Sequence, residues 1–168
     1  DAGMSRVYVL PMDELDLSDI DFTDVFTVLI SSDFSDDDII ATAASGNITI
    51  TSYANLVSGT ADVVTINGQA FTAQAGAATP GAATFQAATS NNATATSLAA
   101  QINAHAATKD VVTAVANNAV VTITEKQVGL GGNALTLGYT DNDSNVGATK
   151  SGTNLTGGDG LFLGDFEG

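Results

Sequence analysis

Residues Asn92–Ala107, NATATSLAAQINAHAA, decide how the rest of the chain can be arranged. Leu98, Ile102 and Ala106 recur at every fourth position, and this spacing predicts an amphipathic helix. The same face carries Ala95 and Ala99. Because a helix of this length with so narrow an apolar stripe is marginal in water, we expect it to pack on a sheet.

Two hairpins are predicted on either side of this helix. Before it, Asp62–Ile66 and Gln69–Ala73 flank an Asn-Gly pair, the usual sequence of a type I′ turn. After it, Val111–Val115 and Ala119–Thr124 flank Asn117-Asn118, which tolerate positive φ. Further strands are expected at 47–53, near Phe85, at 134–139 and, at a sheet edge, at 146–150.

The expected packing places the helix on one face of an antiparallel sheet. Leu98 and Ile102 would then be buried against apolar strand residues. These are Val64, Ile66, Val121 and Ile123. Asn92 or Thr94 is expected to be the N-cap of the helix.

The composition changes near Ala44, which we take as a domain boundary. Residues 1–44 hold two nearly continuous apolar runs, 6–12 and 25–31, and Ser35 is a good N-cap for a helix through Ala43. We therefore predict an α+β chain, in which a β-rich inserted domain (45–158; hairpins with one helix packed on the sheet) stands on a partial α/β core (1–44 and 159–168). Both ends read as interrupted elements, so we interpret the chain as a fragment of a longer protein.

Charge and composition exclude several classes of function. The 168 residues include 19 acidic and only 4 basic side chains, a net charge of −15. This balance argues against nucleic-acid binding and against binding to anionic membranes. No apolar run approaches the roughly 20 residues that a membrane span needs. The absence of cysteine removes disulfides and thiolate metal sites.

One segment resembles part of a calcium loop. Asp141, Asp143 and Asn145 supply oxygen atoms at the first, third and fifth positions of an EF-hand. The pattern then fails, because the sixth and twelfth positions hold Val146 and Gly152 instead of Gly and Glu. We prefer an Asx-rich turn to a metal site, and keep these three residues as the metal candidates.

No other group of residues predicts catalysis or a cofactor. His105, the sole histidine, lies near the end of the predicted helix, where interaction with the helix C-terminus explains it without a metal or a catalytic role. The Gly129–Gly132 turn lacks the lysine of a phosphate loop. The acidic runs 13–24 and 36–38 read as a solvated face and a helix N-terminus, although they could bind divalent ions or basic surfaces. Gly157–Gly160 is a turn unless the fold brings it beside Asp141. We predict that the chain is not an enzyme.

Several stretches together resemble a phage protein family. TINGQAFTA, SLAAQINAHA, AVVTITEK and GLGGNALTL are similar to a small domain that recurs in phage tail proteins, especially as an insertion in contractile-tail sheath subunits. The flanking stretches SRVYVLP, FTVLISSDFSDDDI and LFLGDFEG are similar to the α/β core of the sheath.

This resemblance implies a structural virion protein that assembles around the tail tube and contracts mechanically. Its partners would be neighbouring copies of the same protein, and the tail tube through parts absent from this chain. Its location would be the virion tail, assembled in the cytoplasm of the bacterial host. The insert is expected to face outward.

The alternative is a surface or adhesin-like module that recognises a host glycan or protein. Three tyrosines, expected to be exposed, are its only stacking candidates of that kind, because tryptophan is absent. A calcium-stabilised module is a third possibility.

Overall fold

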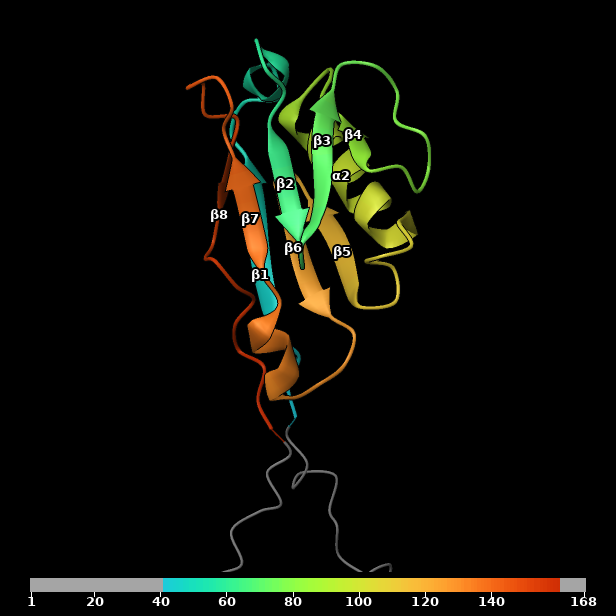
Figure 1. Ribbon diagram of the computed structural model, residues 1–168, viewed down its shortest axis with the longest axis vertical. Helices are drawn as coiled ribbons and strands as arrows, with labels where there is room; N and C mark the ends of the chain where they lie inside the picture. The colour runs from blue at the N-terminus through green and yellow to red at the C-terminus, as the bar shows by residue number, and fades with distance from the viewer. Residues whose placement is uncertain (1–40, 161–168) are drawn as a thin grey trace, which may run out of the picture. The chain divides into compact units, whose positions relative to one another are not determined.

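A computed structural model describes residues 41–160, which form two four-stranded β-sheets, one α-helix and two 3₁₀-helices (Figure 1). The elements are β1 Ser45–Ile50, η2 Asn55–Val57, β2 Val63–Ile66, β3 Gln69–Gln74, β4 Thr84–Gln86, α2 Asn91–Ala104, β5 Val112–Asn117, β6 Val120–Glu125, η3 Leu130–Ala134, β7 Leu137–Thr140 and β8 Ala148–Lys150. The β-rich α+β class is confirmed for this part of the chain. The predicted core strands 6–12 and 25–31 lie outside the described residues. Of the predicted helix from Ser35, only 41–43 are described, and they are not helical.

The strands form two sheets, so the prediction of one antiparallel sheet was wrong. Their orders are β5-β6-β1-β8 and β4-β3-β2-β7. The first sheet is antiparallel throughout, whereas β4 joins β3 in parallel after a long connection. Splitting the strands into two sheets gives the inward side chains of each a second apolar surface to pack against.

Both predicted hairpins are confirmed. Asn67 and Gly68 have φ of 48° and 79°, and Ile66 pairs with Gln69, as a two-residue type I′ turn requires. In the second hairpin the turn lies at Asn118-Ala119, one residue later than expected, and Asn118 has φ of 53°.

The core consists of the inward side chains of both sheets. Strand alternation decides its members, because every second residue of a half-buried strand faces inward. The largest fully buried strand residues are Ile48, Ile50, Val64, Ile66, Phe71, Phe85, Ile123 and Leu137. Each side chain of this kind contributes about 1.5–3 kcal/mol by leaving water.

Helix α2 covers one side of the two sheets, beside the edge strands β4 and β5 (Figure 1). Leu98 and Ile102 are fully buried, as predicted. Ala106 is exposed because the helix ends at Ala104, so its assignment to the apolar stripe was wrong. No helix within 41–160 is long and apolar enough to span a bilayer.

The N-cap of α2 is Ser90, which corrects the prediction of Asn92 or Thr94. Ser90 has extended φ and ψ, and its Oγ accepts a hydrogen bond from the Ala93 N–H at 3.1 Å. The helix begins at Asn91, so Asn92 lies in its first turn, and Thr94 is buried with its hydroxyl bonded to the Ser90 carbonyl.

The exposed side of α2 carries an asparagine that acts as a short piece of strand. The Asn103 Oδ1 accepts from the Ala114 N–H at 2.8 Å, and its Nδ2 donates to the Ala114 carbonyl at 2.7 Å. Ala114 lies in the middle of β5, an edge strand of the first sheet. The side chain therefore occupies the place where a neighbouring strand would bond.

Two further polar side chains of α2 bond to backbone groups. Asn91 accepts from the Tyr53 N–H at 2.8 Å and donates to the Thr51 carbonyl at 3.0 Å, which fastens the segment after β1. The Ser97 Oγ accepts from the N–H of Gln86, in edge strand β4, at 2.8 Å. The helix is thus attached by polar bonds as well as by its apolar stripe.

The two ends of the described segment pair with each other at what we term the foot, residues 42–45 and 156–159. Ser45 and Thr156 exchange both backbone hydrogen bonds, at 2.8 and 2.9 Å. The Thr42 hydroxyl donates to the Gly157 carbonyl at 2.6 Å, and Ala44 is fully buried in the core. Packing of the β-rich part therefore starts at Thr42, slightly before the proposed boundary.

Candidate functional site

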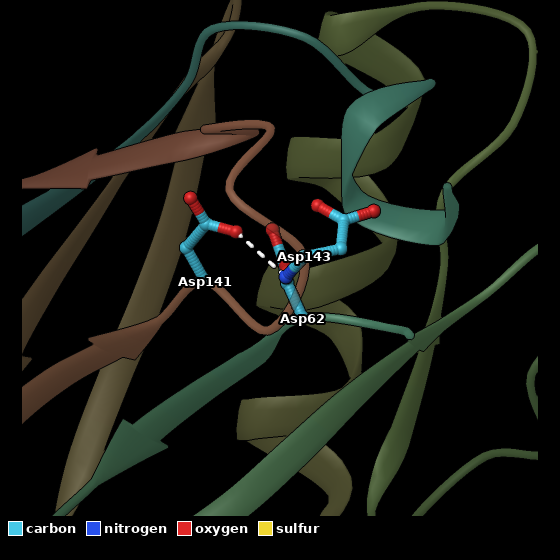
Figure 2. Close-up of side chains that lie close together, drawn as sticks. All are labelled: Asp62, Asp141 and Asp143. Carbon is cyan, nitrogen blue, oxygen red and sulfur yellow. Dashed lines mark hydrogen bonds between the residues drawn. The ribbon is translucent and has the colours of Figure 1, made fainter. Parts of the chain in front are cut away.

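Three aspartates form an acidic cluster at the end of the described part that lies opposite the foot (Figure 1). Asp62 precedes β2, and Asp141 and Asp143 lie in the loop after β7 (Figure 2). Each offers a carboxylate oxygen within 4.8 Å of the others. Such a set of oxygen atoms suits a hard cation such as Ca²⁺, so its hydrogen bonds decide what it can do.

Asp62 is fully buried and already paired. Its Oδ2 accepts from the Tyr139 hydroxyl at 2.6 Å, and its Oδ1 accepts from the Asn142 N–H at 3.0 Å. Its own backbone N–H donates to the Leu56 carbonyl at 2.9 Å. These donors offset the cost of burying a carboxylate.

Tyr139 connects Asp62 with the far end of the same loop. Its hydroxyl donates to Asp62 and accepts from the Gly147 N–H at 2.8 Å. Burial, followed by the hydrogen bond to the Asp62 carboxylate, raises the pKa of Tyr139 to about 12. The hydroxyl therefore keeps its proton, and with it this bridge, well above neutral pH.

Asp141 and Asp143 form the Asx-rich turn that the sequence predicts. The Asp141 Oδ1 accepts from the N–H groups of Asp143 and Ser144 at 3.1 and 2.9 Å. Asp143 accepts from the Asn145 N–H at 2.9 Å and from the Ser58 hydroxyl at 2.6 Å, and the Ser58 bond is the main reason that its pKa is lowered. Asn145, the third metal candidate, is exposed and contributes a donor to this turn.

The cluster acts chemically as a fastening for the 141–147 loop, which we call the loop clasp. Both oxygens of Asp62 and of Asp143, and one of Asp141, accept hydrogen bonds. A cation would have to compete with these donors. The end of the loop also packs closely against Leu56, because a Cβ atom on Gly147 would lie only 2.7 Å from Leu56 side-chain atoms.

Sequence reasoning identified Asp141 and Asp143 but missed Asp62. The available signal was its isolation, since it is the only charged side chain between Asp38 and Lys109. A single acid in a long uncharged, β-rich stretch is more consistent with a buried, paired group than with a solvated surface.

The other sequence candidates lie away from the loop clasp. Gly157–Gly160 is at the foot, where Asn133 donates to and accepts from Gly158. His105 is the C-cap of α2, and its ring meets Phe71 edge to face at 5.4 Å. The acidic runs 13–24 and 36–38 lie outside the described residues.

The tyrosines do not form the exposed platform that was expected. Tyr53 and Tyr139 are half-buried and pack against the core, so this expectation was wrong for both. Tyr8 lies outside the described residues. Both rings offer less exposed surface for stacking on a sugar than exposed tyrosines would.

Comparisons with known proteins assign no family. No protein-family model matches the chain, and no curated protein sequence matches it significantly. Its function has to be inferred from its own residues and their geometry.

Proposed function

We propose that this chain is part of a phage contractile-tail sheath subunit, in which the β-rich domain is a structural insertion. Copies would pack around the tail tube, and contraction would shift them between two packed arrangements. The flanking stretches SRVYVLP and LFLGDFEG carry the resemblance to the sheath core. The tube would be contacted by parts outside this chain, in virion tails assembled in the host cytoplasm.

The pairing of the two ends at the foot is the main support for the proposal that the β-rich domain is an insertion. Ser45 and Thr156 exchange backbone bonds, so the chain enters and leaves the domain at one place. A domain with adjacent ends can occupy a loop of another domain without separating the elements that the loop connects. This geometry fits the assignment of residues 1–44 and 159–168 to one core.

The chemistry of the described residues supports a structural role. The loop clasp uses its carboxylates as hydrogen-bond acceptors, and His105 packs on Phe71 while its Nδ1 accepts from the Ala107 N–H at 3.2 Å. None of these groups is arranged as a nucleophile with a base and a third, orienting group.

The charge distribution supports an outward-facing insertion. Residues 41–160 hold six acidic residues and three lysines, a net charge of −3 out of −15. The remaining charge belongs to 1–40 and 161–168. The exposed large apolar residues of the described part are Val115, Val128, Leu130 and Val146. A nearly neutral surface with few such residues does not require a permanent neighbour.

The test is a replacement in the full-length subunit. Because Ser45 and Thr156 are paired, a short Gly-Ser linker can replace the segment between them without moving the flanks. We expect the unmodified and the replaced subunits both to form sheath-like tubes in electron micrographs. If only the unmodified subunit formed tubes, the insertion would not be expendable. If neither subunit formed them in the presence of the tail tube, the sheath function would be contradicted.

The alternative of a host-binding module makes a different prediction. A glycan-array screen with the present chain should give no specific signal if the insertion is structural. Reproducible binding to one glycan class would favour the alternative, and the half-buried Tyr53 and Tyr139 argue against that result.

A further inference from the structure

We propose that Asn103 closes the edge of β5 against strand addition by a second copy of this chain. Strand β5 has a neighbour on one side only, and the edge of a sheet presents unpaired N–H and C=O groups to any other strand. The inference concerns self-association and does not depend on the sheath function.

Strand β5 is the longest edge strand in the described part. It has six residues, whereas the other edge strands, β4, β7 and β8, have three, four and three. The shorter edges are also obstructed: Ser97 bonds to β4, the Leu137 N–H of β7 donates to the Thr153 carbonyl at 2.8 Å, and Lys150 ends β8. The β5 edge therefore has the most backbone groups with which another strand could pair.

Side chain and backbone groups of this chain occupy that edge. The N–H and C=O of Ala114 point away from β6, because both bond to Asn103. Backbone groups alternate along an antiparallel strand, so Val112 and Ala116 face the same way. The Val112 N–H donates to the Thr108 carbonyl at 2.9 Å. Only Ala116 keeps both outward groups, too little for a ladder.

The strand that fits this edge best is another β5. Two copies related by a two-fold axis can pair antiparallel, and each would supply the same outward groups. Thr113 and Val115 are exposed and have high β-propensity, and Val115 is 60% exposed. Removing the Asn103 amide would free both outward groups of Ala114, beside those of Ala116, while the Val112 N–H would stay bonded to Thr108.

The experiment uses the whole chain and measures molar mass by light scattering over a range of concentrations. We expect the molar mass of the Asn103→Ala variant to rise with concentration toward twice that of the wild type. Hydrogen exchange at the Ala114 N–H should be fast in dilute solution and slow where the variant associates. Asn91→Ala is the matched control, because it removes the same kind of amide bridge from α2 without opening a sheet edge. It should keep the wild-type mass.

A second variant identifies the surface that associates. Adding Val115→Lys to Asn103→Ala should restore the wild-type mass, because a charge on an edge strand opposes pairing. If Asn103→Ala is not folded by circular dichroism, Asn103→Ser, whose hydroxyl is too short to bridge both groups, carries the same comparison. The proposal is overturned if the folded variant keeps the wild-type mass while Ala114 exchanges faster, or if Val115→Lys leaves the association unchanged.

Discussion

The aspartate that sequence reasoning missed connects both ends of the 141–147 loop. Asp62 receives one bond from the start of the 141–147 loop and one from Tyr139, which also holds the end of that loop. Asp141 and Asp143 organise the turn between them. A motif search finds the turn, because its acids are close in sequence, but not Asp62, which lies almost 80 positions away.

Replacing Asp62 by Ala should destabilise the fold strongly. The Tyr139 hydroxyl and the Asn142 N–H would both lose a charged acceptor, and the loss is expected to be about 3 kcal/mol. Tyr139→Phe, which removes one donor, should cost about 1 kcal/mol. Urea unfolding measures both. Asp110→Asn is the control, since its pair with Lys109 is exposed and should change stability by less than about 1 kcal/mol. Equal effects of Asp62→Ala and Asp110→Asn would contradict the clasp.

The raised pKa of Tyr139 predicts a loss of stability in alkali. The unfolded chain releases this proton near its ordinary pKa of 10.0, whereas the folded chain holds it to about 12. The stabilisation is therefore complete below pH 10 and is lost as the pH rises through 12. Between pH 10 and pH 12, the free energy of unfolding should fall more steeply with pH for the wild type than for Tyr139→Phe. Identical slopes would show that Tyr139 titrates like an ordinary tyrosine.

Removal of divalent cations should leave the melting temperature unchanged. The carboxylates of the loop clasp already accept hydrogen bonds, so a cation would gain little by displacing those donors. Scanning calorimetry with chelator and with excess Ca²⁺ tests this. A calcium-dependent increase that disappears in Asp141→Asn would instead identify the cluster as a metal site.

Among the elements, those built from neighbouring residues were predictable and those built from distant ones were not. The β2–β3 hairpin follows from Asn67-Gly68, and α2 from the spacing of Leu98 and Ile102. The parallel pairing of β4 with β3, and the division into two sheets, depend on contacts that no local pattern contains. The polar bonds of α2 were missed for the same reason, because Asn91 and Asn103 look like ordinary solvent-facing residues.

The corrected N-cap gives a test at the level of the helix. Ser90→Ala should destabilise the chain by about 1 kcal/mol, because the Ala93 N–H loses its acceptor. Asn92→Ala is the sequence-based counterpart and should change stability by less than about 0.5 kcal/mol, since Asn92 is exposed. Thermal unfolding of both variants decides between them. A larger loss for Asn92→Ala would restore the original assignment.

At the scale of the molecule, residues 41–160 should fold without the rest of the chain. They contain a continuous core, and their ends are joined by backbone hydrogen bonds at the foot. We expect the isolated segment to unfold in one cooperative transition. A shorter segment, 47–154, should be much less stable, because it lacks the buried Ala44 and Leu155 and the pairing of Ser45 with Thr156. Equal stability of the two segments would show that the foot does not contribute.

The foot also determines how the domain responds to force. A pull that draws residues 42 and 159 apart acts first on the bonds of Thr42 to Asp159 and Gly157 and then on the Ser45–Thr156 pair, so the hydrogen bonds break one after another. Pulling along the strands would load many bonds at once and meet far more resistance. If the protein to which the domain is attached moves both ends together, neither load arises and the domain stays folded during large movements. If the two ends are separated, the domain should unfold at low force.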